Sequence, residues 1–223
     1  TVPTLTWIGH STFLWQYQGV NLITDPHLTQ RASPVNFLGP QRLVEPGLSL
    51  TDLPVIDIVI ISHNHYDHLD RKTVSALVEQ QPENPPLFMV PLGLKDWFAD
   101  IGIKEKVIEL DWWQSHRVGD WQLNAVPVQH WSRRGLLDTN EVLWCGWVVE
   151  APGKRLFFAG DTGYSNDFNL LHVSKLSFSI KFNILLSLIK YNESVYFSFN
   201  NFKLSYANLF IIVISICIKY FFK

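Results

Sequence analysis

The last quarter of the sequence lacks the residues that usually form turns. Residues 169–223 contain no Gly, Pro, Trp, Asp, Arg, Gln, Thr or Met, whereas all twelve glycines, all twelve prolines and all nine tryptophans lie before residue 165. Glycine and proline supply most of the turns of a folded domain. Their absence argues against a compact α/β continuation in this segment.

Three interpretations of residues 169–223 are open. The segment consists mainly of Phe, Ile, Leu, Asn, Lys, Ser and Tyr, the residues that AT-rich codons specify, so we favour a shifted reading frame. The others are a helical extension and a membrane anchor, although the apolar run at 208–218 is shorter than the roughly 20 residues of a spanning helix. We therefore expect a domain at residues 1–168, truncated at its C-terminal side, and a non-matching low-complexity tail at 169–223.

The sequence also contains few cysteines and no large excess of charge of either sign. Only Cys145 and Cys217 are present, which excludes a disulfide framework and indicates a reducing compartment. The formal net charge of -2 argues against nucleic acid as a partner. The chain opens on a strand-like stretch rather than on a charged and then apolar leader, so we expect a cytoplasmic protein.

The first 168 residues read as short strands with a few helices. A hairpin is predicted around the Gln18-Gly19 turn, and residues 29–54 read as a long irregular loop. The run from Val55 to Ser62 predicts a buried strand, and Asp70 is a predicted N-cap of a helix to about Gln81. Further strands are predicted at 4–7, 87–90, 107–110, 122–128, 142–150 and 155–159, with a short helix at 94–100. This alternation predicts a layered α/β domain.

The stretch Ser-His-Asn-His-Tyr-Asp-His-Leu-Asp at 62–70 follows the predicted buried strand directly. His63 and His65 point the same way if the strand exit stays extended, so they can share one metal ion. Asp67 and His68 lie past the bend and can reach a second ion. Imidazole and carboxylate ligands in this density suit zinc, which leaves one position open for water in catalytic sites.

Two later strand ends add candidate ligands. His130 follows the predicted strand at 122–128, and Asp161 lies between two glycines after the strand at 155–159. Two zinc ions would lower the pKa of a bound water to roughly 7 and would polarise a carbonyl or phosphoryl oxygen. The expected reaction is therefore hydrolysis of an ester-like or phosphoester bond.

Seven motifs give the chain a resemblance to a known family. The histidine–aspartate loop, His130 and the Gly-Asp-Thr-Gly turn resemble the metallo-β-lactamase superfamily. More narrowly, the sequence is similar to the N-acyl-phosphatidylethanolamine-hydrolysing phospholipases D and their bacterial relatives. The motifs span residues 4 to about 168 and are WIGHSTFL, TDPHLTQRASP, SHNHYDHLD, LDWW, PVQHWSRR, VLWCGW and FFAGDTGY.

The resemblance implies an αββα sandwich with two zinc ions between its sheets. By the family pattern His63, His65 and His130 hold one zinc, and Asp67 with His68 holds the other. Asp161 bridges both ions, so the catalytic residues implied are Asp67, His68 and Asp161. The implied substrate is an N-acyl phospholipid, cleaved to phosphatidic acid and an N-acylethanolamine, with peripheral membrane contact left open.

Five further residues are candidates for supporting roles. Tyr66 lies where the family contacts the phospholipid head group. His10 and Asp25 are candidates for orienting the ligands, because ligand histidines usually donate their second N–H to a neighbour. Arg133 and Arg134, close to His130, are either phosphate contacts or a solvated loop pair.

The resemblance ends near Phe168. The family continues with a later histidine that completes the second zinc site, and His172 comes too soon after Asp161 to take that role. Three hypotheses follow: a zinc phosphodiesterase, a lactonase of the same superfamily, and a truncated non-catalytic remnant.

Overall fold

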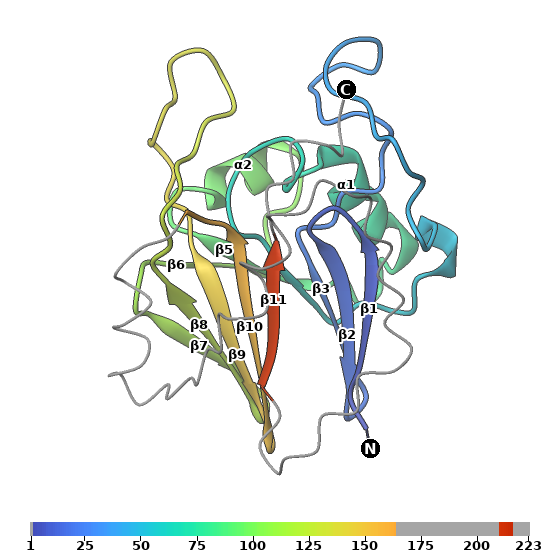
Figure 1. Ribbon diagram of the computed structural model, residues 1–223, viewed down its shortest axis with the longest axis vertical. Helices are drawn as coiled ribbons and strands as arrows, with labels where there is room; N and C mark the ends of the chain where they lie inside the picture. The colour runs from blue at the N-terminus through green and yellow to red at the C-terminus, as the bar shows by residue number, and fades with distance from the viewer. Residues whose placement is uncertain (1, 164–209, 216–223) are drawn as a thin grey trace, which may run out of the picture.

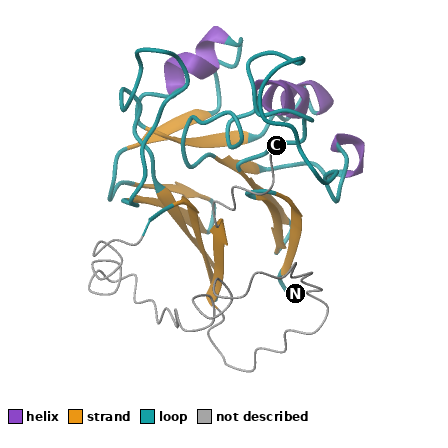
Figure 2. Cartoon of the chain, turned by 45° about the horizontal axis from the view of Figure 1, so that its top comes forward, coloured by secondary structure: helices purple, strands orange, loops and turns teal. Residues whose placement is uncertain are grey.

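Two β-sheets packed face to face form the body of the protein. The computed structural model describes residues 2–163 and the backbone of residues 210–215. Figure 1 shows the two sheets side by side, with the helices gathered at one end. Figure 2 shows the same arrangement with that end turned forward. The domain is an α/β sandwich, as expected from the sequence.

The first sheet has six strands in sequence order. The first two pairs, β1–β2 and β2–β3, are antiparallel, and the remaining pairs are parallel. Parallel strands end at the same edge, so the residues that follow β3, β4 and β5 gather there. The strands are β1 (Thr4–Gly9), β2 (Thr12–Tyr17), β3 (Val20–Thr24), β4 (Ile58–Ile60), β5 (Leu87–Pro91) and β6 (Val107–Leu110).

The second sheet has the order β11-β10-β9-β8-β7. β8 and β10 are both antiparallel to β9, so they run in the same direction and end at the same edge. β11 is parallel to β10. The strands are β7 (Ser115–Val118), β8 (Trp121–Val126), β9 (Gly146–Ala151), β10 (Lys154–Asp161) and β11 (Phe210–Ser215).

Two hydrophobic clusters hold the layers together. The one between the sheets is rich in large side chains, among them Trp15, Trp147 and Phe158, all fully buried. The other lies between the first sheet and the helices α1 (Arg71–Gln80) and α2 (Lys95–Asp100). Asp70 caps α1 as predicted, because its side chain accepts a hydrogen bond from the Lys72 N–H at 3.2 Å.

The structure also refines the predicted elements. The strand expected at 55–62 is regular only at Ile58–Ile60, and the residues after it turn early to form the histidine-rich loop. The long loop at 29–54 contains one short 3-10 helix, η1 (Leu50–Asp52). Strand β7 was not predicted.

The structure tests the prediction for residues 169–223 only in part. β11 lies within residues 169–223, and its six described residues form a strand rather than a helix. Among the described residues, no helix is both long and apolar enough to cross a membrane. His172 and the remainder of the tail lie outside the described residues.

Candidate metal centre

Strand ends from both sheets meet at one edge of the sandwich. In the first sheet, β3 leads into Asp25 and β4 leads into the loop at 62–68. In the second sheet, β8 leads towards His130 and β10 ends at Asp161. The structure therefore brings together residues that lie far apart in the sequence.

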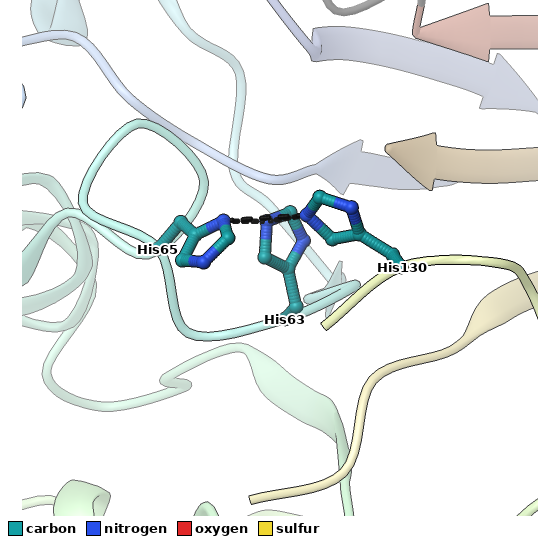
Figure 3. Close-up of side chains that lie close together, drawn as sticks. All are labelled: His63, His65 and His130. Carbon is teal, nitrogen blue, oxygen red and sulfur yellow. Dashed lines mark hydrogen bonds between the residues drawn. The ribbon is translucent and has the colours of Figure 1, made fainter. Parts of the chain in front are cut away.

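Three imidazoles form the first cluster. His63 Nε2 lies 2.8 Å from His65 Nδ1, and His130 Nε2 lies 3.2 Å from His63 Nε2 and 3.3 Å from His65 Nδ1. Figure 3 shows the three rings converging, two from the loop after β4 and one from the loop that follows β8. Three nitrogens bound to one tetrahedral zinc at about 2.05 Å would lie about 3.4 Å apart. The observed spacing is close to that of a ligand set.

Ser62 and Asp25 determine which ring nitrogens face the clusters. The Ser62 hydroxyl donates to Asp25 Oδ2 at 2.6 Å, so its oxygen accepts from His63 Nδ1 at 2.8 Å. A neutral imidazole has one N–H, so His63 Nε2 keeps its lone pair towards the cluster. His68 Nδ1 likewise donates to Asp25 Oδ2 at 2.7 Å, which directs His68 Nε2 away from Asp25.

A second cluster adjoins the first. Asp67 Oδ2 lies 3.0 Å from His10 Nε2 and 3.7 Å from His68 Nε2, and the ligand atoms of these three residues lie within 4.8 Å of one another. Asp161 faces both clusters: its Oδ1 lies 3.4 Å from His68 Nε2 and its Oδ2 lies 3.9 Å from His130 Nε2. His10, predicted to orient a ligand, thus lies where it can itself bind a metal ion.

Burial and neighbouring charges set the protonation of the two clusters. Burial lowers the pKa of His65 to about 4, and burial with the charges of His68 and His65 lowers that of His63 well below its usual value. Burial disfavours charge on His68, but Asp161 and Asp67 raise its pKa well above the usual value. Burial also opposes ionisation of Asp161, but His68 lowers its pKa to about 2. A metal ion would replace the proton that these carboxylates favour on His68.

The donor set fits a metal ion. His68 Nε2 is buried and makes no hydrogen bond of good geometry among the described residues, although Asp161 Oδ1 lies 3.4 Å away. Buried polar atoms without partners are rare and often mark a missing ion or water. Imidazole nitrogens with carboxylate oxygens are the ligands that zinc prefers.

The two sheets are joined by hydrogen bonds beside the clusters. Trp147 Nε1 donates to the Ile61 carbonyl at 2.8 Å, and the Cys145 N–H donates to the Ser62 carbonyl at 2.9 Å. Gly160 has φ +60°, and a Cβ there would lie 2.4 Å from Ser62 Cβ. Glycine is therefore required where β10 crosses Ser62.

Arg134 links the loop that carries His130 to the histidine-rich loop. Its guanidinium donates to the carbonyls of Asn64 and Leu69 at 2.9 and 2.8 Å, and it lies 4.1 Å from the centre of the Tyr66 ring. The Tyr66 hydroxyl donates to the Arg134 carbonyl at 2.9 Å. Arg134 is thus a partly buried structural contact, and Tyr66 is half-buried against it.

Sequence reasoning missed two residues that support the clusters. Ser62 was predicted only as the end of a strand, yet it connects Asp25 to His63. Arg134 was predicted as a phosphate contact or a solvated residue, and its bonds to the loop carbonyls give it a third role. Neither role has a spacing signal, because both depend on contacts across the fold.

Comparison with known proteins identifies a family over most of the chain. The beta-lactamase superfamily domain matches residues 20–176. The chain is 44% identical over 165 residues to an uncharacterised protein of Mycobacterium tuberculosis, covering 74% of this chain and 43% of that protein. It is 41% identical over 170 residues to N-acyl-phosphatidylethanolamine-hydrolyzing phospholipase D 1 of Caenorhabditis elegans, covering 71% and 46%.

A third relative extends the comparison. The mitochondrial N-acyl-phosphatidylethanolamine-hydrolyzing phospholipase D of Saccharomyces cerevisiae is 38% identical over 167 residues, covering 73% of this chain and 35% of that protein. The matches therefore span less than half of each of these three relatives.

The fold is similar to that of CmlA, a diiron β-hydroxylase from Streptomyces venezuelae, with a TM-score of 0.59, 22% identity and coverage of 78% and 33%. It is also similar to an isothiocyanate hydrolase from Delia radicum gut bacteria, with a TM-score of 0.57, 22% identity and coverage of 76% and 67%.

Proposed function

Because this chain belongs to the metallo-β-lactamase superfamily, we propose that it is a zinc-dependent phosphodiesterase acting on N-acyl-phosphatidylethanolamine-like phospholipids. Relatives whose names state this activity are 38–41% identical to the chain over about three quarters of its length. The proposal includes a cytoplasmic protein that contacts its lipid from the membrane surface.

One observation carries the proposal: two ligand clusters share Asp161. One oxygen of this carboxylate faces His68 and the other faces His130. A carboxylate placed in this way can bridge two ions, and paired ions suit phosphodiester hydrolysis. A single structural zinc would need only one of the clusters.

We assign His63, His65 and His130 to one zinc, and Asp67, His68 and His10 to the other, with Asp161 between them. When bound, the pair supplies a hydroxide nucleophile at neutral pH and neutralises charge on the phosphoryl oxygens. We propose that the hydrolase domain ends near residue 168 and that β11, from the segment that follows, adds a strand to the edge of its second sheet.

The protein side chains orient the groups that react. Asp67 is a candidate catalytic group: despite burial, His68 and His10 hold its pKa below the usual value, so it stays an anion that can bind a metal ion and accept a hydrogen bond from water. Asp25 keeps the His68 ring in place through Nδ1. Tyr66 lies between His65 and Asp67 in the sequence, lines the hollow between the two long loops and is the proposed head-group contact.

The first experiment measures zinc per chain after metal-free purification and zinc repletion, with iron repletion as a parallel sample. About two zinc ions, with release of N-acylethanolamine from N-acyl-phosphatidylethanolamine, supports the proposal. Asp161→Asn is expected to reduce the zinc content and to abolish hydrolysis.

Other outcomes would replace the proposal. Faster hydrolysis of a sugar-phosphate lactone than of the diester by the same sample would make the protein a lactonase. One zinc or less, without hydrolysis of either substrate, would identify a non-catalytic remnant. Hydrolysis only after iron repletion would show that the active metal is iron rather than zinc.

A further inference from the structure

Two loops expose pairs of large apolar side chains. Leu136 and Leu137 are 86% and 92% exposed, and Phe37 and Leu38 are 82% and 66% exposed. Leu43 and Val44 of the second loop are also more than half exposed. Single exposed apolar residues are ordinary, but adjacent pairs at loop tips indicate an interaction surface.

Hydrogen bonds hold both tips in place. Arg133 donates from Nε to the Gly135 carbonyl and from Nη2 to the Leu136 carbonyl, at 2.9 and 3.1 Å. Arg31 donates to the Gly39 carbonyl at 2.6 Å and to Gln41 Oε1 at 3.0 Å across the base of the other loop. The apolar pairs are therefore presented by closed loops rather than by a free chain.

The two loops lie on the same face. In Figure 1 they project at the same end of the molecule, one in blue and one in yellow. A hollow of about 750 Å³ lies between them, lined by residues 28–36 of one loop and 134–138 of the other. Tyr66, which lies between His65 and Asp67 in the histidine-rich loop, also lines it, although the candidate metal ligands themselves do not.

The hollow carries excess positive charge. Its lining includes four cationic side chains and two carboxylates. Internal hydrogen bonds involve both kinds of group, since Asp70 accepts from Thr73 Oγ1 at 2.6 Å and Asp138 from the Gly135 N–H at 2.7 Å, while Arg31 and Arg134 donate to loop carbonyls. The cations are Arg31, Arg71, Lys72 and Arg134.

We propose that this face binds the surface of a membrane containing anionic phospholipid, with the two apolar pairs entering the interface and the cationic hollow facing head groups. Apolar tips around a cationic recess suit a deformable, negatively charged surface, which can contact both at once. This inference rests on the proposed function only for the choice of lipid as partner; its test needs no hydrolysis.

The test is co-sedimentation of the full chain with vesicles. One set contains phosphatidylcholine alone, and the other contains equal parts of phosphatidylcholine and phosphatidylglycerol. We expect binding to the anionic set that weakens with added salt, because exposed charges are screened. The double variant Leu136→Ser/Leu137→Ser should bind at least about tenfold more weakly, since two leucines no longer leave water.

Matched variants distinguish binding through these two loops from nonspecific adsorption to vesicles. Val55→Ser alters a valine that is 58% exposed before β4, at the strand end away from the histidine-rich loop, and should bind as the unaltered chain does. Phe37→Ser/Leu38→Ser should weaken binding as the leucine pair does. Circular dichroism checks that each variant folds.

Several results would overturn the inference. The folded chain would fail to bind vesicles, or the leucine double variant would bind them as tightly as the unaltered chain. A dimer that forms through these loops in place of vesicle binding would have the same consequence. Hydrolysis of a short-chain, monomeric diester is measured separately and should be retained in the leucine variant. Absence of hydrolysis with normal vesicle binding would contradict the proposed function alone.

Discussion

At the scale of residues, Asp25 is the group that connects the most site contacts. It accepts hydrogen bonds from the Ser62 N–H at 2.7 Å, the Ser62 hydroxyl at 2.6 Å and His68 Nδ1 at 2.7 Å. Asp25→Asn should lower zinc affinity by about 10- to 100-fold, because the ligand histidines lose orientation. Competition with a chelator measures this. Asp120→Asn, at the exposed β7–β8 turn, is the control; equal affinity in both variants would contradict the role.

Gly160 offers a second test with a close control. Gly160→Ala should destabilise the fold by about 3 kcal/mol or more, because its Cβ would overlap Ser62. Gly153 also has positive φ, but no atom lies within 4 Å of a Cβ built there, so Gly153→Ala should cost about 1–2 kcal/mol. Urea unfolding measures both. Equal losses of unfolding free energy in the two variants would show that backbone strain, rather than overlap with Ser62, accounts for the effect.

His27 predicts a pH effect on stability. Burial lowers its pKa from 6.5 to about 4, and the charge of Arg42 contributes. The folded state thus favours the neutral ring, so this stabilisation is complete above pH 6.5 and is lost as pH falls towards 4. The loss should reach about 3 kcal/mol. His27→Gln should remove that part of the pH slope in urea unfolding, whereas His116→Gln on β7 should keep it.

At the scale of elements, Arg134 connects two loops that bring candidate metal ligands from different sheets. Arg134→Gln should cost about 1–3 kcal/mol, because the Asn64 and Leu69 carbonyls lose their donors. Arg134→Gln should also weaken zinc binding. Arg133→Gln, which alters the exposed neighbouring residue, should lower the unfolding free energy and the zinc affinity less. Urea unfolding and chelator competition measure the two effects, and equal losses would contradict the connection.

The elements also show what sequence patterns can predict. The hairpin at Gln18-Gly19, the Asp70 cap and the strands of the parallel region follow from local signals, and the structure confirms them. β7 was missed because Ser115–Val118 has only half-buried and exposed residues and pairs at the sheet edge. The contact of Ser62 with Gly160 depends on how the sheets pack, which no local pattern encodes.

At the scale of the whole molecule, a metal ion would act as a cross-link between the sheets. His63 and His65 follow a strand of the first sheet, and His130 follows a strand of the second. Zinc should therefore stabilise the fold by about 2.7 kcal/mol when free zinc is about one hundred times Kd. Thermal unfolding with zinc and after chelation measures this. An unchanged Tm would show that the clusters bind no ion in the folded state.

The order of the ligands along the chain has a consequence for biosynthesis. The histidine-rich loop is synthesised well before Asp161, and the strands between them must first pair and dock. A nascent chain can therefore present His63 and His65 to cellular metals while their remaining partners are still inside the ribosome. If the clusters bind metal ions, a complete set of the proposed ligands requires that Asp161 has been synthesised and that β10 has paired with β9.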